Sequence, residues 1–224
     1  MALFAISDLH LSLSTDKPMD IFGWGNHAER IRANWCRVVG ENDTVVIPGD
    51  ISWGLKTEEA AEDLKFIDSL PGRKLILKGN HDLWWQTRAK NEKFFASIGV
   101  TTISIIFNNS VAAEGYEICG TRGWFYDAGI DRKVVLREAG RLEASLSFNK
   151  ETEKEKIVFL HYPPVFGEQV CQEIWSVIKK HNVRRVFYGH IHGIGHLNCH
   201  SEYDGVALKL VACDHTNFTP IQIV

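Results

Sequence analysis

Leu75-Ile76-Leu77-Lys78-Gly79-Asn80-His81-Asp82 joins a short apolar run directly to a group of polar side chains. The same order, apolar and then polar, occurs in four other segments of the chain. The five apolar runs cover residues 3–6, 44–47, 75–77, 157–160 and 186–188. They are rich in β-branched and aromatic residues, which is typical of buried strands. Because ligands bind at the carboxyl ends of strands in open α/β sheets, the pattern predicts an α/β fold with one site at five strand ends.

The polar segments after these runs contain side chains that can bind metal. The candidate ligands are Asp8, His10, Asp50, Asn80, His161, His190 and His192. In an extended chain, residues i and i+2 project to the same side, so Asp8 and His10 are expected to reach one metal together. For the same reason, His190 and His192 are expected to share a side.

This set offers nitrogen and oxygen atoms without thiolate, which suits Mn²⁺, Fe or Zn²⁺. Two cations about 3.5–4 Å apart need a bridging carboxylate. Asp50 is the lone carboxylate after the second strand and is therefore the expected bridge. Gly49, Gly79 and Gly189 stand directly before candidate ligands, which predicts turns that bring the backbone close to the site. The sequence thus predicts two divalent metal ions at one site.

Amphipathic stretches separate several of the predicted strands. The predicted helices cover residues 26–40, 57–70, 131–146 and 173–181. Asn26 and Glu29 resemble a capping box, while Thr57 and Asp131 are the expected caps of the second and third helices. Residues 103–107, 111–119, 206–211 and 220–224 are predicted strands without helices between them. The result is an α/β protein that begins β-α-β-α-β and has extra, partly antiparallel strands.

Length and composition are those of an ordinary globular protein. The 224 residues are predicted to form a single domain, 1–224. A net charge of −3 gives no chain-wide basic field for extended nucleic acid or anionic membranes. Five scattered cysteines fit reduced thiols in the cytosol. The apolar start at residues 2–6 is too short for a secretory core or a membrane span. We therefore expect a soluble, cytoplasmic protein.

Taken together, the five polar segments resemble the calcineurin-like metallophosphoesterase superfamily. Its pattern is D-x-H, G-D, G-N-H-[DE], a lone His and G-H-x-H, and all five occur here in that order over residues 8–192. Each segment alone is weak, but the set is specific. The resemblance implies a two-sheet β-sandwich flanked by helices, which is a four-layer α-β-β-α fold. It also implies a dimetal site at the C-terminal ends of the strands.

The resemblance assigns a role to each candidate by position. Residues that resemble ligands of one metal are Asp8, His10 and His192; those of the other are Asn80, His161 and His190, with Asp50 as the bridge. His81 matches the family's catalytic histidine. The implied reaction is in-line attack on phosphorus by a metal-bridging hydroxide, with His81 donating a proton to the leaving oxygen. Either Asp82 or a backbone group would orient His81.

One segment departs from the protein serine/threonine phosphatase branch of that superfamily. That branch continues its G-D segment with D-R-G, which supplies a phosphate-gripping arginine. Here the continuation is Ile51-Ser52-Trp53-Gly54, and G-N-H ends in Asp82 rather than Glu. A phosphoprotein phosphatase of that type is therefore disfavoured.

Contacts to substrate are less specific in the sequence. Trp84 or Trp85 is the first candidate to stack on a substrate ring, although core packing is the default for large aromatic residues. Arg122 could grip phosphate or form a structural ion pair. Residues 18–26 are interpreted as a substrate-facing loop, because loops at this sheet edge carry specificity. The histidines interpreted as surface or core residues are His27, His181 and His215, whereas His196 and His200 could support the site.

The leading hypothesis is a phosphoesterase that acts on a small phosphate ester, with monoester and diester both open. Cyclic-nucleotide diesterases of the superfamily carry similar segments, including G-N-H-D. Its nucleases usually bring an added domain, for which this chain has little room, and no amphipathic stretch indicates a lipid-linked substrate. The rival is a metal-bound scaffold that serves as a binding module without catalysis. Retention of His81 and of every ligand position argues against that rival.

Overall fold

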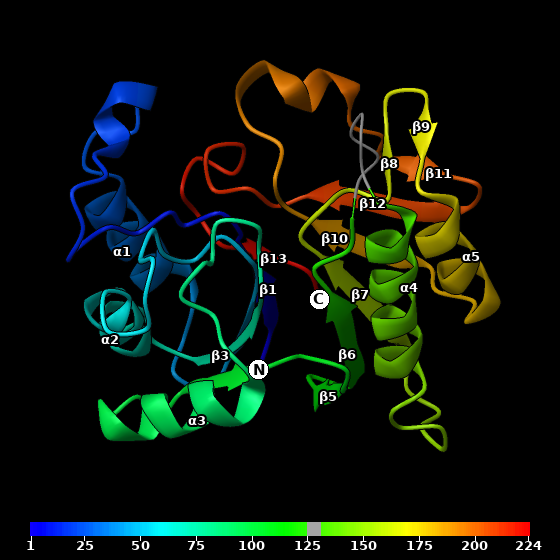
Figure 1. Cartoon of the computed structure of the whole chain (residues 1–224), viewed down its shortest axis with the longest axis horizontal. Helices are drawn as coiled ribbons and strands as arrows, with labels where there is room; N and C mark the ends of the chain where they lie inside the picture. Colours follow the sequence, from blue (N-terminus) through cyan, green and yellow to red (C-terminus); the bar gives the residue numbers. More distant parts are fainter. Residues whose placement is uncertain (125–130) are drawn as a thin grey trace.

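Two β-sheets lie face to face between two groups of helices (Figure 1). This computed structural model describes residues 1–124 and 131–224. The first sheet has the order β13-β1-β2-β3-β4, in which β13 is antiparallel and the other strands are parallel. Its strands are β1 (Leu3–Ala5), β2 (Thr44–Pro48), β3 (Arg73–Leu77), β4 (Ile103–Ile105) and β13 (Ile221–Gln222).

The second sheet has the order β11-β12-β10-β7-β6-β5, with antiparallel strands at both edges. Its strands are β5 (Val111–Ala113), β6 (Tyr116–Thr121), β7 (Lys156–Leu160), β10 (Arg185–Tyr188), β11 (Glu202–Tyr203) and β12 (Val206–Leu210). A separate hairpin consists of β8 (Val165–Phe166) and β9 (Gln169–Val170).

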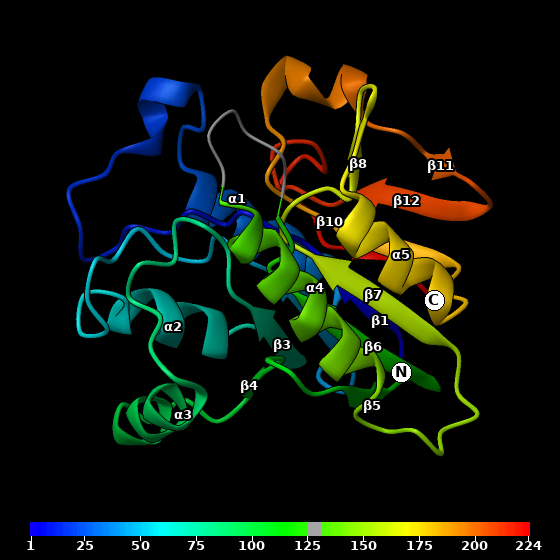
Figure 2. The same ribbon diagram turned by 45° about the vertical axis from the view of Figure 1, so that its right-hand side comes forward.

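Helices cover the outer face of each sheet (Figures 1 and 2). The helices packed on the first sheet are α1 (His27–Val38), α2 (Ala61–Asp68) and α3 (Arg88–Ser97), and those on the second are α4 (Arg132–Leu146) and α5 (Gln172–Lys180). Two short 3-10 helices, η1 (Met19–Phe22) and η2 (Gly193–Asn198), lie in loops. The predicted four-layer α-β-β-α fold is confirmed. Among the described residues, no helix is long and apolar enough to cross a membrane.

The alternation of side chains along each strand builds three apolar layers. In β7, Ile157 and Phe159 point into the layer between the sheets, while Val158 and Leu160 pack under α4 and α5. β1 divides its residues in the same way, so that Leu3 faces the other sheet. Strands buried on both faces explain why the predicted runs are continuously apolar.

Several predicted boundaries are wrong. Asn26 does precede α1, but it has a left-handed backbone and its side chain forms no cap. Thr57 does not cap α2, since that helix begins at Ala61. The predicted strand 111–119 is a hairpin of β5 and β6, which turns where Glu114 and Gly115 both have positive φ. Asp131 caps α4 as predicted, by accepting a hydrogen bond from the amide of Lys133.

The two sheets are joined directly beside the end of β1. Ser7 forms an isolated parallel bridge with Ala212, just beyond β12 of the other sheet. The amide of Ser7 donates to Val211 at 2.8 Å, and the amide of Cys213 donates to Ser7 at 2.9 Å. The polar residues after β1 are therefore held against both sheets.

Candidate metal centre

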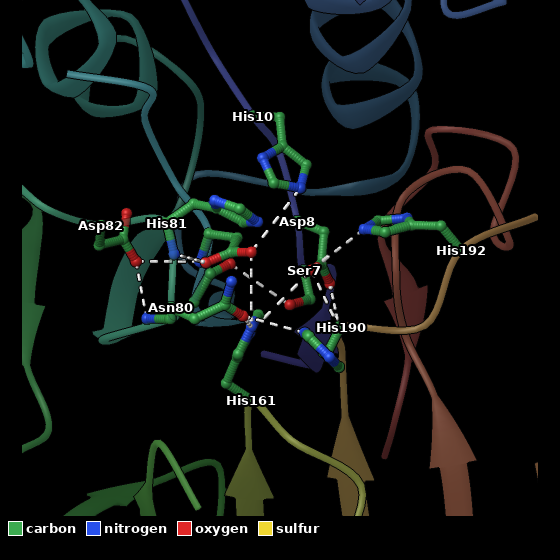
Figure 3. Close-up of polar contacts among 12 residues, drawn as sticks. Ser7, Asp8, His10, Asn80, His81, Asp82, His161, His190 and His192 are labelled. Atoms are coloured by element: carbon green, nitrogen blue, oxygen red, sulfur yellow. Dashed lines mark hydrogen bonds and ion pairs between the residues drawn. The ribbon is translucent and has the colours of Figure 1, made fainter. Parts of the chain in front are cut away.

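The polar segments after β1, β2, β3, β7 and β10 meet at one edge of the sandwich (Figure 3). The first three strands belong to one sheet and the last two to the other. The residues gathered there are Asp8, His10, Asp50, Asn80, His81, Asp82, His161, His190 and His192. The structure thus brings together all the predicted ligands and the predicted catalytic histidine.

The backbone bends sharply at four of these residues. Asp8, His10, Asp50 and His190 have φ angles of 59°, 45°, 51° and 71°. Residues other than glycine rarely adopt this region, at a cost of about 1–3 kcal/mol each. The expected extended chain at Asp8 and His10 is therefore wrong. The two side chains reach the same site through successive turns, with the amide of His10 donating to the carbonyl of Asp50 at 3.0 Å.

Glycines before the ligands allow close packing of these turns, as predicted. A methyl group on Gly79 would overlap the carboxylate of Asp50, and one on Gly189 would overlap the carboxylate of Asp8. A Cβ at Gly49 would lie 2.6 Å from the Cα of Gly79. Side chains at these positions would push the carboxylates out of place.

Asp8 contacts ligand candidates from the segments after β7 and β10 of the second sheet. Its Oδ1 atom lies 3.5 Å from Nε2 of His192 and 4.0 Å from Nδ1 of His161. Both carboxylate oxygens also accept from the amide of His190, at 3.0 Å. Burial opposes ionisation of Asp8, but the hydrogen bond with His192 and the nearby histidines outweigh burial and lower its pKa. Asp8 is thus held as a carboxylate.

His192 is fixed from behind by Asp214, which sequence analysis missed. Nδ1 of His192 lies 3.0 Å from Oδ1 of Asp214, whose other oxygen accepts from the amide of Gly193. This pairing directs Nε2 of His192 towards Asp8, as in carboxylate–histidine–metal arrangements. Burial lowers the pKa of His192, but its hydrogen bonds to Asp214 and Asp8 prevail and raise it to about 10. The sequence contained a signal for Asp214, because this residue follows the apolar strand β12 just as the other candidates follow their strands.

Asp50 lies in the middle of the group. Its Oδ2 atom is 3.8 Å from Nε2 of His10 and 3.4 Å from Nε2 of His161. Its Oδ1 atom accepts from the amide of His81 at 2.8 Å. Burial, followed by the charges of Asp8 and Asp82, raises the pKa of Asp50 to about 9. A cation beside Asp50 would offset that repulsion.

Asn80, His161 and His190 form the other side of the site. Oδ1 of Asn80 lies 2.6 Å from Nε2 of His161 and 2.9 Å from Nδ1 of His190. Nδ1 of His161 lies 3.1 Å from the carbonyl of Pro48. Because that carbonyl can only accept, the Nδ1 proton turns the Nε2 lone pair towards Asn80 and Asp50. His190 and His192 contact different partners, although both line one cavity.

The donor set fits bound metal. Burial lowers the pKa of His10 and of His161 to about 3, so both imidazoles are neutral near pH 7, which is the form that binds cations. Within the described residues, two groups place one ligand atom per residue within 4.8 Å of each other: Asp8 with His10 and His192, and Asp8 with Asp50 and His161. Nδ1 of His10 is buried and has no hydrogen-bond partner in the described part of the chain. These residues could hold two divalent cations.

Asp82 does not orient His81. Its buried carboxylate accepts from the amides of Gly79, Asp50 and Ile51 at 2.7–2.9 Å and from the indole of Trp84 at 3.0 Å. The carboxylate therefore ties the segment after β3 to the segment after β2.

A cavity of about 720 Å³ opens over the candidate ligands. His81 lines it, with its ring centroid 4.5 Å from that of Trp53, which is also stacked on His10 at 4.8 Å. Residues 18–26 face this cavity as expected, through Met19, Phe22 and Trp24. The walls beside the ligands are therefore largely apolar.

Trp84, Trp85 and Arg122 do not line this cavity. Trp84 and Trp85 are 1% and 8% exposed and belong to the core under α2 and α3, so the predicted stacking of Trp84 on a substrate ring is not supported. Arg122 lies 3.5 Å from Glu138, and burial, only partly opposed by Glu138, lowers its pKa. It lines a separate pocket.

The other histidines lie outside the ligand group. His27 is buried, with Nε2 3.2 Å from the carbonyl of His10, and His181 pairs with Glu143 at 3.0 Å. His196 and His200 contact the carbonyls of Gly193 and Gly167. His215 is exposed beside His196.

The sequence model of the calcineurin-like phosphoesterase family matches residues 1–193. The chain belongs to this family. Membership in the calcineurin-like phosphoesterases implies metal-dependent hydrolysis of phosphoesters, and the Asp and His residues described above could bind that metal.

One curated protein and several solved structures are similar to this chain. The Gene 66 protein of Mycobacterium phage L5 is 40% identical over 80 residues, which is 34% of this chain and 37% of that protein. The chain thus matches little more than a third of the length of this curated relative. A protein of unknown function from Aquifex aeolicus has a TM-score of 0.58 at 16% identity, over 99% of this chain and 95% of that one. A Thermus thermophilus protein also has a TM-score of 0.58, at 14% identity over 98% and 96%. Both structures share the fold.

Proposed function

We propose that this calcineurin-like phosphoesterase is a dimetal-dependent hydrolase of small phosphate esters. One metal would be held by Asp8, His10 and His192, and the other by Asn80, His161 and His190, with Asp50 shared between them. The position of Asp50 carries this proposal, because its Oδ2 atom lies between Nε2 of His10 and Nε2 of His161, at 3.8 and 3.4 Å. A shared carboxylate between two neutral imidazoles is what a pair of cations requires.

When bound, the two cations supply positive charge that activates the attacking water and stabilises the phosphoryl oxygens. The chain supplies the other functions. Asp214 and the carbonyl of Pro48 orient His192 and His161 through their Nδ1 atoms. His81 lines the cavity beside the ligands and has its ring held against Trp53, so we assign it as the proton donor to the leaving oxygen.

The cavity walls favour esters that carry an apolar or aromatic group. The apolar residues that line the cavity include Phe22, Trp24, Trp53 and Ile194, the last of which lies in η2. Aromatic faces of this kind bury an apolar substituent next to the polar phosphate. We assign these residues, rather than Trp84, to contact with the apolar part of the substrate.

Further parts of the proposal rest on the sequence. Manganese is the proposed metal because the ligands are nitrogen and oxygen atoms, although iron and zinc suit the same set. A single domain over residues 1–224 and a cytoplasmic location are also proposed. The five free cysteines are consistent with a reducing compartment.

The deciding experiment compares hydrolysis of p-nitrophenyl phosphate and bis-p-nitrophenyl phosphate by the Mn²⁺-loaded protein. We expect turnover of at least one ester, and the preferred ester identifies a monoesterase or a diesterase. His81→Ala should lower kcat by about 10²–10⁴-fold at unchanged metal content, which is the usual contribution of a general acid. His215→Ala is the matched control, since His215 is exposed and outside the cavity.

Two outcomes would count against the proposal. If the metal-loaded wild type turned over neither ester nor a panel of phosphosugars and nucleotides, the rival binding scaffold would be favoured. If His81→Ala retained full kcat, the proton donor would lie elsewhere. Phe22→Ala should lower the preference for aryl over alkyl phosphates, because Phe22 is 65% exposed in the cavity wall.

A further inference from the structure

A second cavity, of about 270 Å³, lies between the end of β3, the end of β6 and α4. Its charged lining consists of Lys78, Arg122, Arg137, Arg141 and Glu138, and we call these five residues the basic pocket. Among the lining residues that the structure describes, four cations thus face a single carboxylate. Such an excess of positive charge in a recess concentrates anions.

Glu138 cannot neutralise the basic pocket. Its side chain is fully buried, and it accepts from Thr121 at 2.9 Å, from Arg141 at 2.5 Å and from Arg122 at 3.5 Å. Nε of Arg122 is buried and has no hydrogen-bond partner among the described residues. Within residues 1–124 and 131–224, neither Lys78 nor Arg137 forms a hydrogen bond or ion pair through its side chain. Donors for an additional anion are therefore present.

The two inner guanidinium groups are held in place before any ligand binds. Arg122 lies over the ring of Trp124 at 4.4 Å, and Arg141 lies over the ring of Phe107 at 5.0 Å. Stacking on aromatic faces fixes the plane of each guanidinium group. Side chains that are already ordered lose less entropy on binding, so a rigid pair favours a compact anion with several oxygens.

Of the residues that the structure describes, none lines both the basic pocket and the cavity over the candidate ligands. It lies near the Asn80 side of the metal centre, because Lys78 is two residues before Asn80. The carbonyl of Arg122 also accepts from the amides of His161 and Tyr162, at 3.1 and 2.9 Å. The two sites are thus separate but adjacent.

We propose that the basic pocket binds a phosphate group in addition to the one cleaved at the metal centre. Arg and Lys side chains around a recess are typical of phosphate recognition. That phosphate could belong to the same substrate, as in a bisphosphorylated molecule, or to a separate phosphorylated ligand. The proposal rests on the charges of the pocket and not on hydrolysis.

The test is calorimetric titration of inorganic phosphate into Mn²⁺-loaded protein at constant ionic strength. The double variant Lys78→Gln with Arg137→Gln removes two cations that pair with no described residue, so the Glu138 contacts stay intact. Wild type should bind two equivalents of phosphate, whereas the double variant should bind one, with the second at least ~10-fold weaker. The matched control is Lys133→Gln, an exposed lysine on α4 outside the pocket.

One equivalent of phosphate in wild type, double variant and control alike would overturn the proposal. The single variant Arg137→Gln serves if the double variant does not fold, and it should weaken the second site by ~3-fold. The stoichiometry would differ between wild type and variant even in a protein without turnover. Failure of this proposal is therefore distinguishable from failure of the proposed hydrolase activity.

A kinetic comparison identifies the source of the phosphate. If the pocket holds a second phosphate of the substrate, the double variant should raise KM for fructose 1,6-bisphosphate but not for p-nitrophenyl phosphate. If the pocket holds a separate ligand, KM for both esters should stay constant while the second phosphate equivalent is lost. An increase in KM for p-nitrophenyl phosphate with only one phosphate equivalent in wild type would place the pocket within the metal centre and contradict the proposal.

Discussion

Asp82 acts on the site through the backbone and not through His81. Its carboxylate accepts hydrogen bonds from backbone amides of the segments after β2 and β3, including the amide of Asp50. Each amide that it accepts fixes the direction of the turn that carries a candidate ligand. Asp82 follows His81 directly in the sequence, but it supports the backbone rather than orienting that histidine.

The variant Asp82→Asn should be strongly destabilised. An amide group replaces one acceptor oxygen with a donor, which then faces backbone donors in a fully buried site. The expected loss is about 2–4 kcal/mol of unfolding free energy, measured by urea denaturation, because buried donors lose their acceptor. Asp16→Asn, at an exposed position, is the control. Equal midpoints for both variants would contradict this role of Asp82.

At the residue scale, the ligand candidates were predictable because each follows an apolar run. Asp214 obeys the same rule after β12, but it lies outside the five segments that resemble the family. Trp53 and Trp24 could not be separated from Trp84 by sequence, since all are large aromatic residues near ligand segments. Only the packing decides which rings face the cavity.

Lys74, near the start of β3, is a fully buried lysine. Nζ of Lys74 donates to the carbonyls of Asp68 and Leu70 at the end of α2 and to the hydroxyl of Thr102 before β4. The side chain therefore ties β3 to the end of α2 and to the segment before β4. Burial lowers the pKa of Lys74 to about 8, although Asp68 and Glu41 oppose the shift.

Lys74 should make the unfolding free energy rise with pH between about pH 8 and pH 10.5. Below pH 8 the folded state bears the cost of a buried charge. Between about pH 8 and the unfolded pKa near 10.5, the folded lysine is neutral while the unfolded one is still protonated, so the unfolding free energy increases. The gain over that window is on the order of 2 kcal/mol.

Urea denaturation at pH 7, 8.5 and 10 measures this effect as the difference between wild type and Lys74→Met. The difference should grow in favour of wild type as pH rises, because methionine does not titrate. Lys93→Met, at an exposed position on α3, corrects for the general effect of losing a lysine. A constant difference across the range would show that Lys74 keeps its ordinary pKa.

Helices whose buried apolar residues recur at helical spacing were predictable from the sequence. Helices with few buried apolar residues were not. α3 was missed because only Asn91 and Phe95 are buried along it, although Thr87 caps it. Gly140 lies within α4 without ending it, since the rest of the helix buries a full apolar face. Boundaries at Thr57 and at the β5–β6 turn depended on tertiary contacts that propensity does not contain.

In the whole molecule, two sheets with their helices contribute residues to one candidate site. The sequence pattern indicated an α/β fold, but the two-sheet arrangement came from the family resemblance. The order of the strands could not be deduced from the sequence. β12 pairs with β10. Just beyond β12, Ala212 forms a bridge with Ser7, which is remote in sequence. Three apolar layers hold the sandwich, while the candidate ligands come from both sheets.

Metal binding should therefore stabilise the entire fold. A ligand that binds only the folded state at 1,000 times its Kd adds about 4 kcal/mol. For a chain of this size, that corresponds to a rise in Tm of roughly 8–16 °C. Calorimetric melting with Mn²⁺ and then with excess chelator measures the shift. Asp50→Asn should lose most of the shift, Asp16→Asn should keep it, and an unchanged wild-type Tm would contradict a site shared by both sheets.

The bridge between Ser7 and Ala212 brings together two ends of the chain that leave the ribosome far apart in time. Asp8 is synthesised well before His192, which its carboxylate contacts, and before Asp214, which orients His192. Nascent chains stopped before these residues carry at most part of the ligand set. A metal-uptake assay on stalled chains of increasing length should therefore show a late step and not a gradual rise.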